Sequence, residues 1–198
     1  MVRKGIFVCI EGLDGSGKST QARFLAERLQ KTHKVVLTIE PSHGRIGSFI
    51  RNSYLYGEKR LPSTVEALLF AADRVDHVQN EITPALEAGT VVISDRYLYS
   101  SLAYQGAAGL SLEWIKKINA YAVRPDLALF LDVDLETVMR RLKPRKSLME
   151  NLETQKKVYG FYLDLAKAGL LKRIDGNRPK TEIAEEIFSL VQKFLVSS

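Results

Sequence analysis

The stretch IFVCIEGLDGSGKSTQARFLAERL, residues 6–29, decides the fold prediction. It begins with the continuous apolar run 6–10, passes into a segment with three glycines, and continues from residue 18 with helical periodicity. A short apolar run is typical of a strand that is buried on both faces, and a longer amphipathic run is typical of a helix. The stretch therefore predicts a buried strand, a glycine-rich turn and a helix in direct succession.

The turn itself predicts a phosphate-binding loop. Residues 12–19 read GLDGSGKS and match G-x-x-x-x-G-K-[ST] at every fixed position. Glycines let backbone N–H groups curl around a phosphate, and the following helix directs its positive end at the same anion. Lys18 can reach the β- and γ-phosphates, and the Ser19 hydroxyl can bind Mg²⁺. A turn that only joins strand to helix is the alternative. We predict a nucleoside triphosphate site formed by Gly12, Leu13, Asp14, Gly15, Ser16, Gly17, Lys18, Ser19 and Thr20.

Similar apolar runs recur along the chain and predict the remaining strands. They occupy residues 6–10, 35–39, 90–94, 127–132 and 171–174. Helical patterns separate them, and the last helix collects its apolar residues on one face, namely Ile183, Ile187, Leu190, Val191 and Phe194. Strands that alternate with helices predict one α/β domain over residues 1–198, with a five-stranded parallel sheet flanked by helices.

The composition limits the classes of partner. The chain has 198 residues, a formal net charge of +6 and one cysteine, Cys9. Its basic residues are spread along the chain and form no aromatic-plus-basic platform, which favours a basic exterior or a pocket for a small polyanion over a nucleic-acid surface. No apolar stretch approaches the length of a membrane span, and residues 1–4 lead directly into the first strand. We expect a cytoplasmic protein without a nucleic-acid or membrane partner.

Residues 63–77, STVEALLFAADRVDH, predict a helix that could line a second site. Its expected buried stripe consists of Val65, Leu68, Leu69 and Ala72. At about 100° per residue, Phe70 and Arg74 project from the face roughly opposite that stripe. An aromatic ring beside a guanidinium suits the stacking and edge recognition of a base. The alternative is that Phe70 packs under another helix while Arg74 faces solvent.

Two further segments carry charges that could act on phosphates. In VVISDRYLYSSLAYQG, residues 91–106, Asp95 and Arg96 follow an apolar run and are expected beyond the carboxyl end of a strand, where open α/β sheets bind ligands. Asp95 could hold Mg²⁺ and Arg96 could clamp phosphates, although a local ion pair is the alternative. Residues 139–153, MRRLKPRKSLMENLE, are strongly basic and contain Pro144. They are either a solvated charged face or a lid over a triphosphate, at about 141–152.

Together these segments resemble the thymidylate kinase family. The guanine motif N-K-x-D of GTPases is absent, and a motor protein would need a longer chain. The resemblance runs in order through FVCIEGLDGSGKSTQ, EPSHGRIGSFIR, LLFAADRVDH, DRYLYSSLAYQG, RPDLALFLDVDLE and RLKPRKSLMEN. It implies a three-layer P-loop kinase fold with a small basic lid. It also implies transfer of the γ-phosphoryl group of ATP to dTMP, which gives dTDP and ADP for dTTP biosynthesis, by a homodimer.

The resemblance also implies a role for individual residues. Phe70 would stack on thymine, Arg74 would bond its edge, and Tyr104 would lie against the sugar. The full set of implied substrate-binding residues is Asp14, Arg45, Arg51, Phe70, Arg74, Arg96, Ser101, Tyr104 and Gln105. The implied catalytic residues are Lys18, Arg96, Arg141 and Arg145, and Mg²⁺ would be held by Ser19 and Asp95.

Some segments depart from the family pattern. Residues 42–44 read Ser-His-Gly where many members have Gly-Gly-Thr, and the lid lacks the common Asp-Arg pair before Glu150. The P-loop has no cation at residues 15–16, so the lid arginines would supply that charge. The alternatives are a UMP or CMP kinase, a deoxynucleoside kinase, and a non-catalytic nucleotide-binding module.

Overall fold

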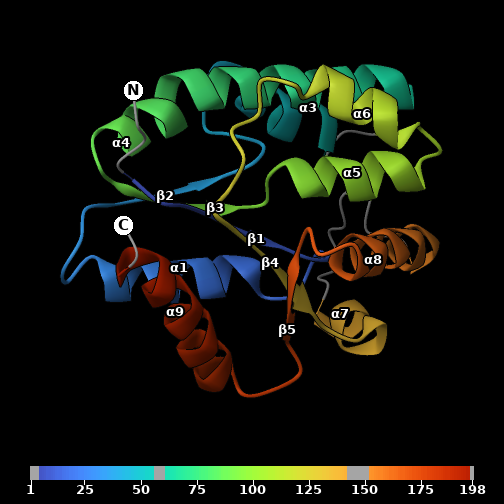
Figure 1. The fold of residues 1–198 in the computed structure, drawn as a ribbon. Coiled ribbons are helices and arrows are strands. Elements are labelled where there is room, and N and C mark those ends of the chain that lie inside the picture. The colour runs from blue at the N-terminus through green and yellow to red at the C-terminus, as the bar shows by residue number, and fades with distance from the viewer. Residues whose placement is uncertain (1–4, 56–60, 142–151, 197–198) are drawn as a thin grey trace.

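The computed structural model describes residues 5–55, 61–141 and 152–196. In this part of the chain one parallel sheet has the strand order β2-β3-β1-β4-β5 (Figure 1). The strands are β1 (Phe7–Glu11), β2 (Val35–Ile39), β3 (Val91–Asp95), β4 (Leu127–Asp132) and β5 (Lys172–Asp175). The predicted parallel sheet is confirmed, with every strand boundary within one residue of its predicted position.

Helices connect the strands and cover both faces of the sheet. They are α1 (Lys18–Leu29), α2 (Arg45–Phe49), α3 (Ser63–His77), α4 (Thr83–Glu87), α5 (Leu98–Ala107), α6 (Leu112–Ile118), α7 (Leu135–Arg141), α8 (Leu152–Lys167) and α9 (Lys180–Val196). Two π-helical segments, η1 (Ile50–Leu55) and η2 (Val78–Ile82), extend α2 and α3. Figure 1 shows α1 and α9 on one side of the sheet and α3 and α4 on the other. The expected three-layer α/β architecture is therefore present.

The central strands explain why the sequence runs are continuously apolar. Every residue of β1, β3 and β4 is buried, because helices cover both faces of the sheet. In the core, Phe130 of β4 stacks on Tyr162 of α8 with a centroid distance of 5.1 Å. On α9 most of the predicted apolar face is confirmed, since Ile183, Ile187 and Val191 are buried and Leu190 is partly buried, whereas Phe194 is 37% exposed.

The strand order brings two predicted motifs together. β1 lies between β3 and β4, and Ile10 at the end of β1 is aligned with Asp95 at the end of β3. The backbone N–H of Arg96 donates to the Ile10 carbonyl oxygen at 3.0 Å. The glycine loop and the Asp95–Arg96 pair therefore emerge side by side at the carboxyl edge of the sheet, as the sequence predicts.

One prediction about α3 is wrong. Val65 and Leu68, which were expected in the buried stripe, are 42% and 50% exposed. The buried side of α3 instead includes Glu66, Asp73 and Arg74, all less than 3% exposed. The prediction counted only apolar side chains, whereas this helix buries charged groups that are paired with other elements.

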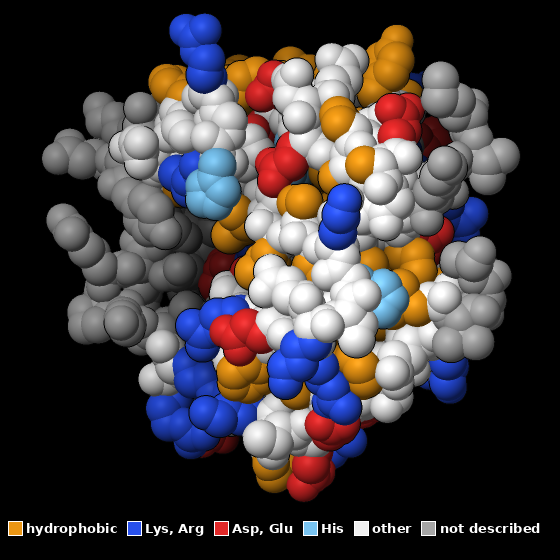
Figure 2. All heavy atoms as spheres, turned by 90° about the vertical axis from the view of Figure 1, so that its left-hand side faces the viewer, with side chains coloured by type: hydrophobic (Ala, Val, Ile, Leu, Met, Phe, Trp, Pro, Cys, Tyr) orange, Lys and Arg blue, Asp and Glu red, His pale blue; other side chains and the backbone are white. Residues whose placement is uncertain are grey.

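The predicted lid lies mostly in residues 142–151, outside the described parts of the chain. Among the described residues, no helix is both long and apolar enough to span a bilayer. On the face seen in Figure 2, lysine and arginine side chains gather in the lower part and acidic side chains lie among them. Positive and negative side chains are therefore mixed in the described part of this face.

Candidate functional site

The glycine loop between β1 and α1 is shaped to surround an anion. Gly12, Gly15 and Gly17 have φ values of 146°, 80° and 101°, which side chains with a Cβ rarely adopt. At Gly12 a Cβ would also lie 2.8 Å from the Leu131 carbonyl oxygen. Lys18 begins α1, and its ammonium donates to the Leu13 carbonyl oxygen at 2.7 Å. The loop therefore has the conformation of a P-loop, and the Lys18 side chain folds back over it.

A cavity of about 470 Å³ opens from this loop. Its lining includes every loop residue from Gly15 to Thr20 together with Arg141 at the end of α7. It also includes Gly176, Arg178 and Lys180, which sequence reasoning missed. These residues follow β5 directly, so the general tendency of ligands to bind beyond strand ends could have indicated them. Their charges suit a polyphosphate.

Burial changes the protonation of the P-loop lysine. Lys18 is 6% exposed, and burial, helped by the nearby Arg96 cation, lowers its pKa to about 8. Asp95 and Asp14 oppose the shift. An incoming polyphosphate would add negative charge beside Lys18, which favours the protonated amine.

Ser19 and Asp95 fit the requirements of a magnesium site. The Ser19 hydroxyl donates to Asp95 Oδ2, and the other oxygen, Asp95 Oδ1, is buried without a hydrogen-bond partner in the described structure. The described ranges contain no group of three or more His, Cys, Asp or Glu residues that could hold a metal ion by itself. Mg²⁺ in nucleotide sites needs only one or two protein oxygens besides phosphates and water, so this pair suffices.

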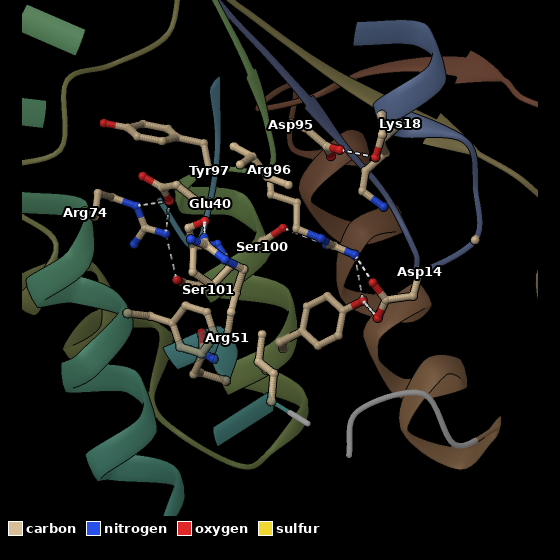
Figure 3. Close-up of a pocket in the computed structure, with 18 residues that line it drawn as sticks. Asp14, Lys18, Glu40, Arg51, Arg74, Asp95, Arg96, Tyr97, Ser100 and Ser101 are labelled. Carbon is tan, nitrogen blue, oxygen red and sulfur yellow. Dashed lines mark hydrogen bonds and ion pairs between the residues drawn. The ribbon is translucent and has the colours of Figure 1, made fainter. Parts of the chain in front are cut away.

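A second cavity, of about 320 Å³, lies beside the P-loop and is drawn in Figure 3. Its lining contains most of the residues predicted to bind an acceptor, namely Asp14, Arg51, Phe70, Arg74, Arg96, Ser101, Tyr104 and Gln105. Gly15, Lys18 and Ser19 line this cavity as well as the first one. The two cavities therefore meet at the P-loop.

One wall of the second cavity is built around Arg96. Its φ of 71° is positive, an uncommon conformation for a residue other than glycine. The guanidinium forms an ion pair with Asp14, and the Tyr104 hydroxyl donates to Asp14 Oδ2 at 2.8 Å. Burial alone would raise the pKa of Asp14, but Arg96 and Lys18 outweigh it and lower that pKa. Asp14 is therefore held as a carboxylate between the P-loop and the cavity.

The opposite wall carries Arg74, as Figure 3 shows. Arg74 is 2% exposed and forms an ion pair with Glu40 at 2.6 Å. It also donates to Asn119 Oδ1 and, at 3.1 Å, to the Ser101 hydroxyl. Glu40 bonds in turn to His77 at 3.2 Å. Burial acts to lower the pKa of His77, but Glu40 and Glu81 together raise it to about 9.

The remaining predicted residues differ in their positions. Arg51 lines the second cavity and donates to the carbonyl oxygens of Pro41 and Ser42. Arg45, at the start of α2, is exposed and is not among the lining residues. Arg141 lies near the P-loop, 3.5 Å from the Ser16 carbonyl oxygen. Arg145 lies outside the described residues.

The chain is similar to known proteins over nearly its whole length. The family model described as thymidylate kinase matches residues 10–187. A protein of Pyrococcus abyssi named "Probable thymidylate kinase" is 48% identical over 203 aligned positions, which cover 98% of each chain. A protein of the same name from Pyrobaculum calidifontis is 41% identical over 194 positions, which cover 97% of this chain and 98% of the relative. The two cavities that meet at the P-loop and this similarity lead to one conclusion: the chain belongs to the thymidylate kinase family.

Proposed function

We propose that the protein transfers the γ-phosphoryl group of ATP to dTMP and releases dTDP and ADP. The observation that carries this proposal is the pair of cavities that share Gly15, Lys18 and Ser19. ATP occupies the cavity that includes Arg178 and Lys180, and dTMP occupies the cavity between Arg74 and Arg96. The γ-phosphate and the acceptor phosphate then meet over the P-loop, which satisfies the proximity requirement of a direct transfer.

The chemistry needs charge neutralisation more than proton abstraction. The second pKa of a phosphate monoester is about 6, so the dTMP phosphate is largely ionised at neutral pH and needs no general base. Lys18 and Arg96 reduce the repulsion between the two anions and stabilise the charge that spreads over the transferred group. Magnesium, held by Ser19 and Asp95, supplies further positive charge when bound. Arg141, which lies near the P-loop, and Arg145, which lies outside the described residues, would complete this set of cations.

In this proposal the base is recognised by Phe70 and Arg74. The Phe70 ring stacks on thymine, and Arg74 bonds its edge. Ser101 and Gln105 also line this cavity and would contact the base, while Tyr104 and Asp14, which are hydrogen-bonded to each other, would face the sugar. Arg51 joins Arg96 at the acceptor phosphate. Arg45 has less support, because its side chain lies in solvent away from the cavity lining.

The acceptor is tested by measuring ATP consumption with dTMP, dUMP, UMP and dCMP in parallel. We expect kcat/KM to be highest for dTMP, because the cavity combines a stacking ring with a buried edge-binding guanidinium. A preference for UMP or dCMP would contradict the proposed acceptor. ATP binding without turnover of any acceptor would instead indicate a nucleotide-binding module.

The lid arginines are tested by substitution. Arg141→Ala and Arg145→Ala should each lower kcat by at least about 10²-fold with little change in dTMP affinity, because a cationic finger acts mainly on the transition state. Arg140→Ala is the matched control, since Arg140 is adjacent but bonds to the Thr137 hydroxyl of its own helix. Wild-type turnover in both lid variants would refute their catalytic role.

The proposal includes a cytoplasmic homodimer. Val65, Leu68 and Ala72 form an exposed apolar stripe on α3, which a second copy of the chain could cover. Leu68→Glu should shift the protein toward monomer in sedimentation velocity, because it places a charge in that interface. A wild-type protein that sediments as a monomer at high concentration would contradict the dimer.

A further inference from the structure

Glu11, the last residue of β1, is a buried carboxylate behind the P-loop that the proposed reaction does not use. It is 0% exposed. Its Oε1 accepts from the backbone N–H groups of Tyr97 and Ser100 at 2.9 and 3.3 Å. Its Oε2 accepts from the Ser100 hydroxyl at 2.6 Å and from the Tyr162 hydroxyl at 3.1 Å. Glu11 thus joins β1 to α5 and α8.

The carboxylate fixes the direction of two hydroxyl protons. An ionised carboxylate only accepts hydrogen bonds, so Ser100 and Tyr162 must both donate to Glu11. Their oxygen lone pairs then remain for other donors. Burial raises the pKa of Glu11, while the hydrogen bond from Ser100 and the Arg96 cation favour its charged form.

Those lone pairs face Arg96. Arg96 Nη1 donates to the Ser100 hydroxyl oxygen at 2.9 Å and lies 3.5 Å from the Tyr162 hydroxyl oxygen. The same nitrogen donates to the Gly12 carbonyl oxygen at 3.1 Å. Nη2 is directed to the other side, toward Asp14. Of the three oxygen atoms around Nη1, the two hydroxyl oxygens therefore depend on Glu11, and the Gly12 carbonyl oxygen does not.

We propose that Glu11 is a positioning residue for Arg96, acting through the Ser100 and Tyr162 hydroxyl groups. By fixing both hydroxyl protons, it presents two oxygen acceptors that hold the guanidinium where the P-loop and the acceptor cavity meet. This inference rests on the proposed contact between Arg96 and the acceptor phosphate. A role limited to capping the start of α5 would require only the two backbone contacts at Oε1 and would not depend on the hydroxyl protons.

Glu11→Gln separates these roles while keeping nearly the same size. The backbone N–H groups of Tyr97 and Ser100 only donate, so the Gln carbonyl oxygen takes the Oε1 position and its amide N–H₂ takes the Oε2 position. Both hydroxyl groups then accept from Gln, and their protons lose the carboxylate. The Ser100 and Tyr162 hydroxyl oxygens lie 3.0 Å apart, so one hydroxyl can donate to the other, while the second proton has lost its acceptor. Capping of α5 survives, but each hydroxyl now uses one lone pair to accept from Gln, so it is a poorer acceptor for Arg96, whereas the Gly12 carbonyl oxygen is unchanged.

The test is a double-mutant cycle of Glu11→Gln with Arg96→Lys, followed by steady-state kinetics and thermal unfolding. We expect Glu11→Gln to lower kcat/KM for dTMP by about 10- to 100-fold, the loss expected for hydrogen bonds to a charged group, and to leave the KM for ATP unchanged. In the Arg96→Lys background, Glu11→Gln should have little further effect. Val191→Ala is the stability control, because it opens a cavity in α9 and should lower the unfolding midpoint without changing kcat/KM.

The outcomes distinguish the inference from the proposed function. If Arg96→Lys loses activity but Glu11→Gln does not, or if their effects are additive, the positioning role is wrong and the role of Arg96 stands. If Arg96→Lys retains wild-type kcat/KM, the proposed phosphate contact itself fails, and the inference fails with it. Should Glu11→Gln not fold, Ser100→Ala and Tyr162→Phe each remove one bridging hydroxyl, and wild-type kinetics in both would overturn the inference.

Discussion

At the scale of single residues, the site combines charges that the surrounding structure has already paired. Arg96 is paired with Asp14, and Arg74 is paired with Glu40. Leaving a buried charge unpaired is strongly destabilising, so these partners keep the empty site folded. In the proposed reaction the acceptor phosphate must compete with Asp14 for Arg96, and the base must compete with Glu40 for Arg74, so binding rearranges ion pairs as well as adding new contacts.

Lys18 gives the first prediction at this scale. Its pKa of about 8 means that roughly half of the molecules carry a neutral lysine at pH 8. Because the polyphosphate favours the ammonium form, ATP binding should take up protons, and ATP affinity should weaken as the pH rises through 8. Isothermal titration calorimetry in buffers with different ionisation enthalpies measures this uptake. Observed heats that do not depend on the buffer at pH 8 would contradict the expectation.

Phe70 gives the second prediction. Phe70→Ala should weaken dTMP binding by about 1–3 kcal/mol, the magnitude of base stacking at other nucleotide sites. Phe49→Ala is the control, because Phe49 is 50% exposed and is not part of the cavity lining. An unchanged Kd for dTMP in the Phe70 variant would remove the ring from the base site.

At the scale of elements, α2 packs so closely on the loop after β2 that it requires glycine at position 47. A Cβ there would collide with the Ser42 backbone and lie 2.7 Å from Asp73 Oδ1. Asp73 accepts from the Ser42 backbone N–H at 2.7 Å and so fixes this loop. Arg51, just beyond α2, bonds to the same loop and lines the acceptor cavity.

Gly47→Ala should therefore destabilise the protein by about 1–3 kcal/mol and raise the KM for dTMP. Gly160→Ala in α8 is the matched control, because its Cβ would meet no atom within 4 Å. Replacing a helical glycine by alanine should there stabilise by about 1 kcal/mol. Chemical denaturation measures both variants, and equal stability changes would show that the close packing at Gly47 is unimportant.

Elements differ in how far the sequence predicts them. The strands and the P-loop follow from local pattern, because a continuous apolar run and a fixed glycine spacing depend on few distant partners. The orientation of α3 does not follow from local pattern. Its buried Arg74 is paired with Glu40, which lies 34 residues earlier, and with Asn119, which lies 45 residues later. Arg178 and Lys180 were missed because they belong to no motif.

At the scale of the whole molecule, the buried charges make stability depend on pH. His77, which is 2% exposed, bonds to Thr38 of β2, to Glu40 just after β2, and to Glu81 of η2. Its folded-state pKa of about 9 lies above the ordinary value of 6.5. The charged imidazole therefore stabilises the fold fully below pH 6.5, and this contribution is lost as the pH rises through 9.

We expect the contribution of His77 to the free energy of unfolding, measured as the difference between wild type and His77→Gln, to fall by an amount on the order of 3 kcal/mol between pH 6.5 and pH 9.5. Lys18, whose pKa is lowered to about 8, acts in the opposite direction over this range in both proteins and cancels in the difference. His77→Gln should flatten this part of the profile, because the variant has no imidazole to titrate. His33→Gln, at an exposed position, should keep the wild-type slope. Urea denaturation across the pH range provides the measurement, and parallel profiles for wild type and His77→Gln would exclude this histidine as the cause.

The strand order also determines which strand of the site exchanges its backbone amide hydrogens most slowly. β1 carries the P-loop and has neighbours on both sides, whereas β5 ends the sheet and precedes Arg178. Backbone amides of a central strand exchange with deuterated solvent only through large openings, while those of a peripheral strand exchange through small ones. Isotope labelling should therefore reach β5, which precedes Arg178 of the donor cavity, long before it reaches the strand behind the phosphate cradle.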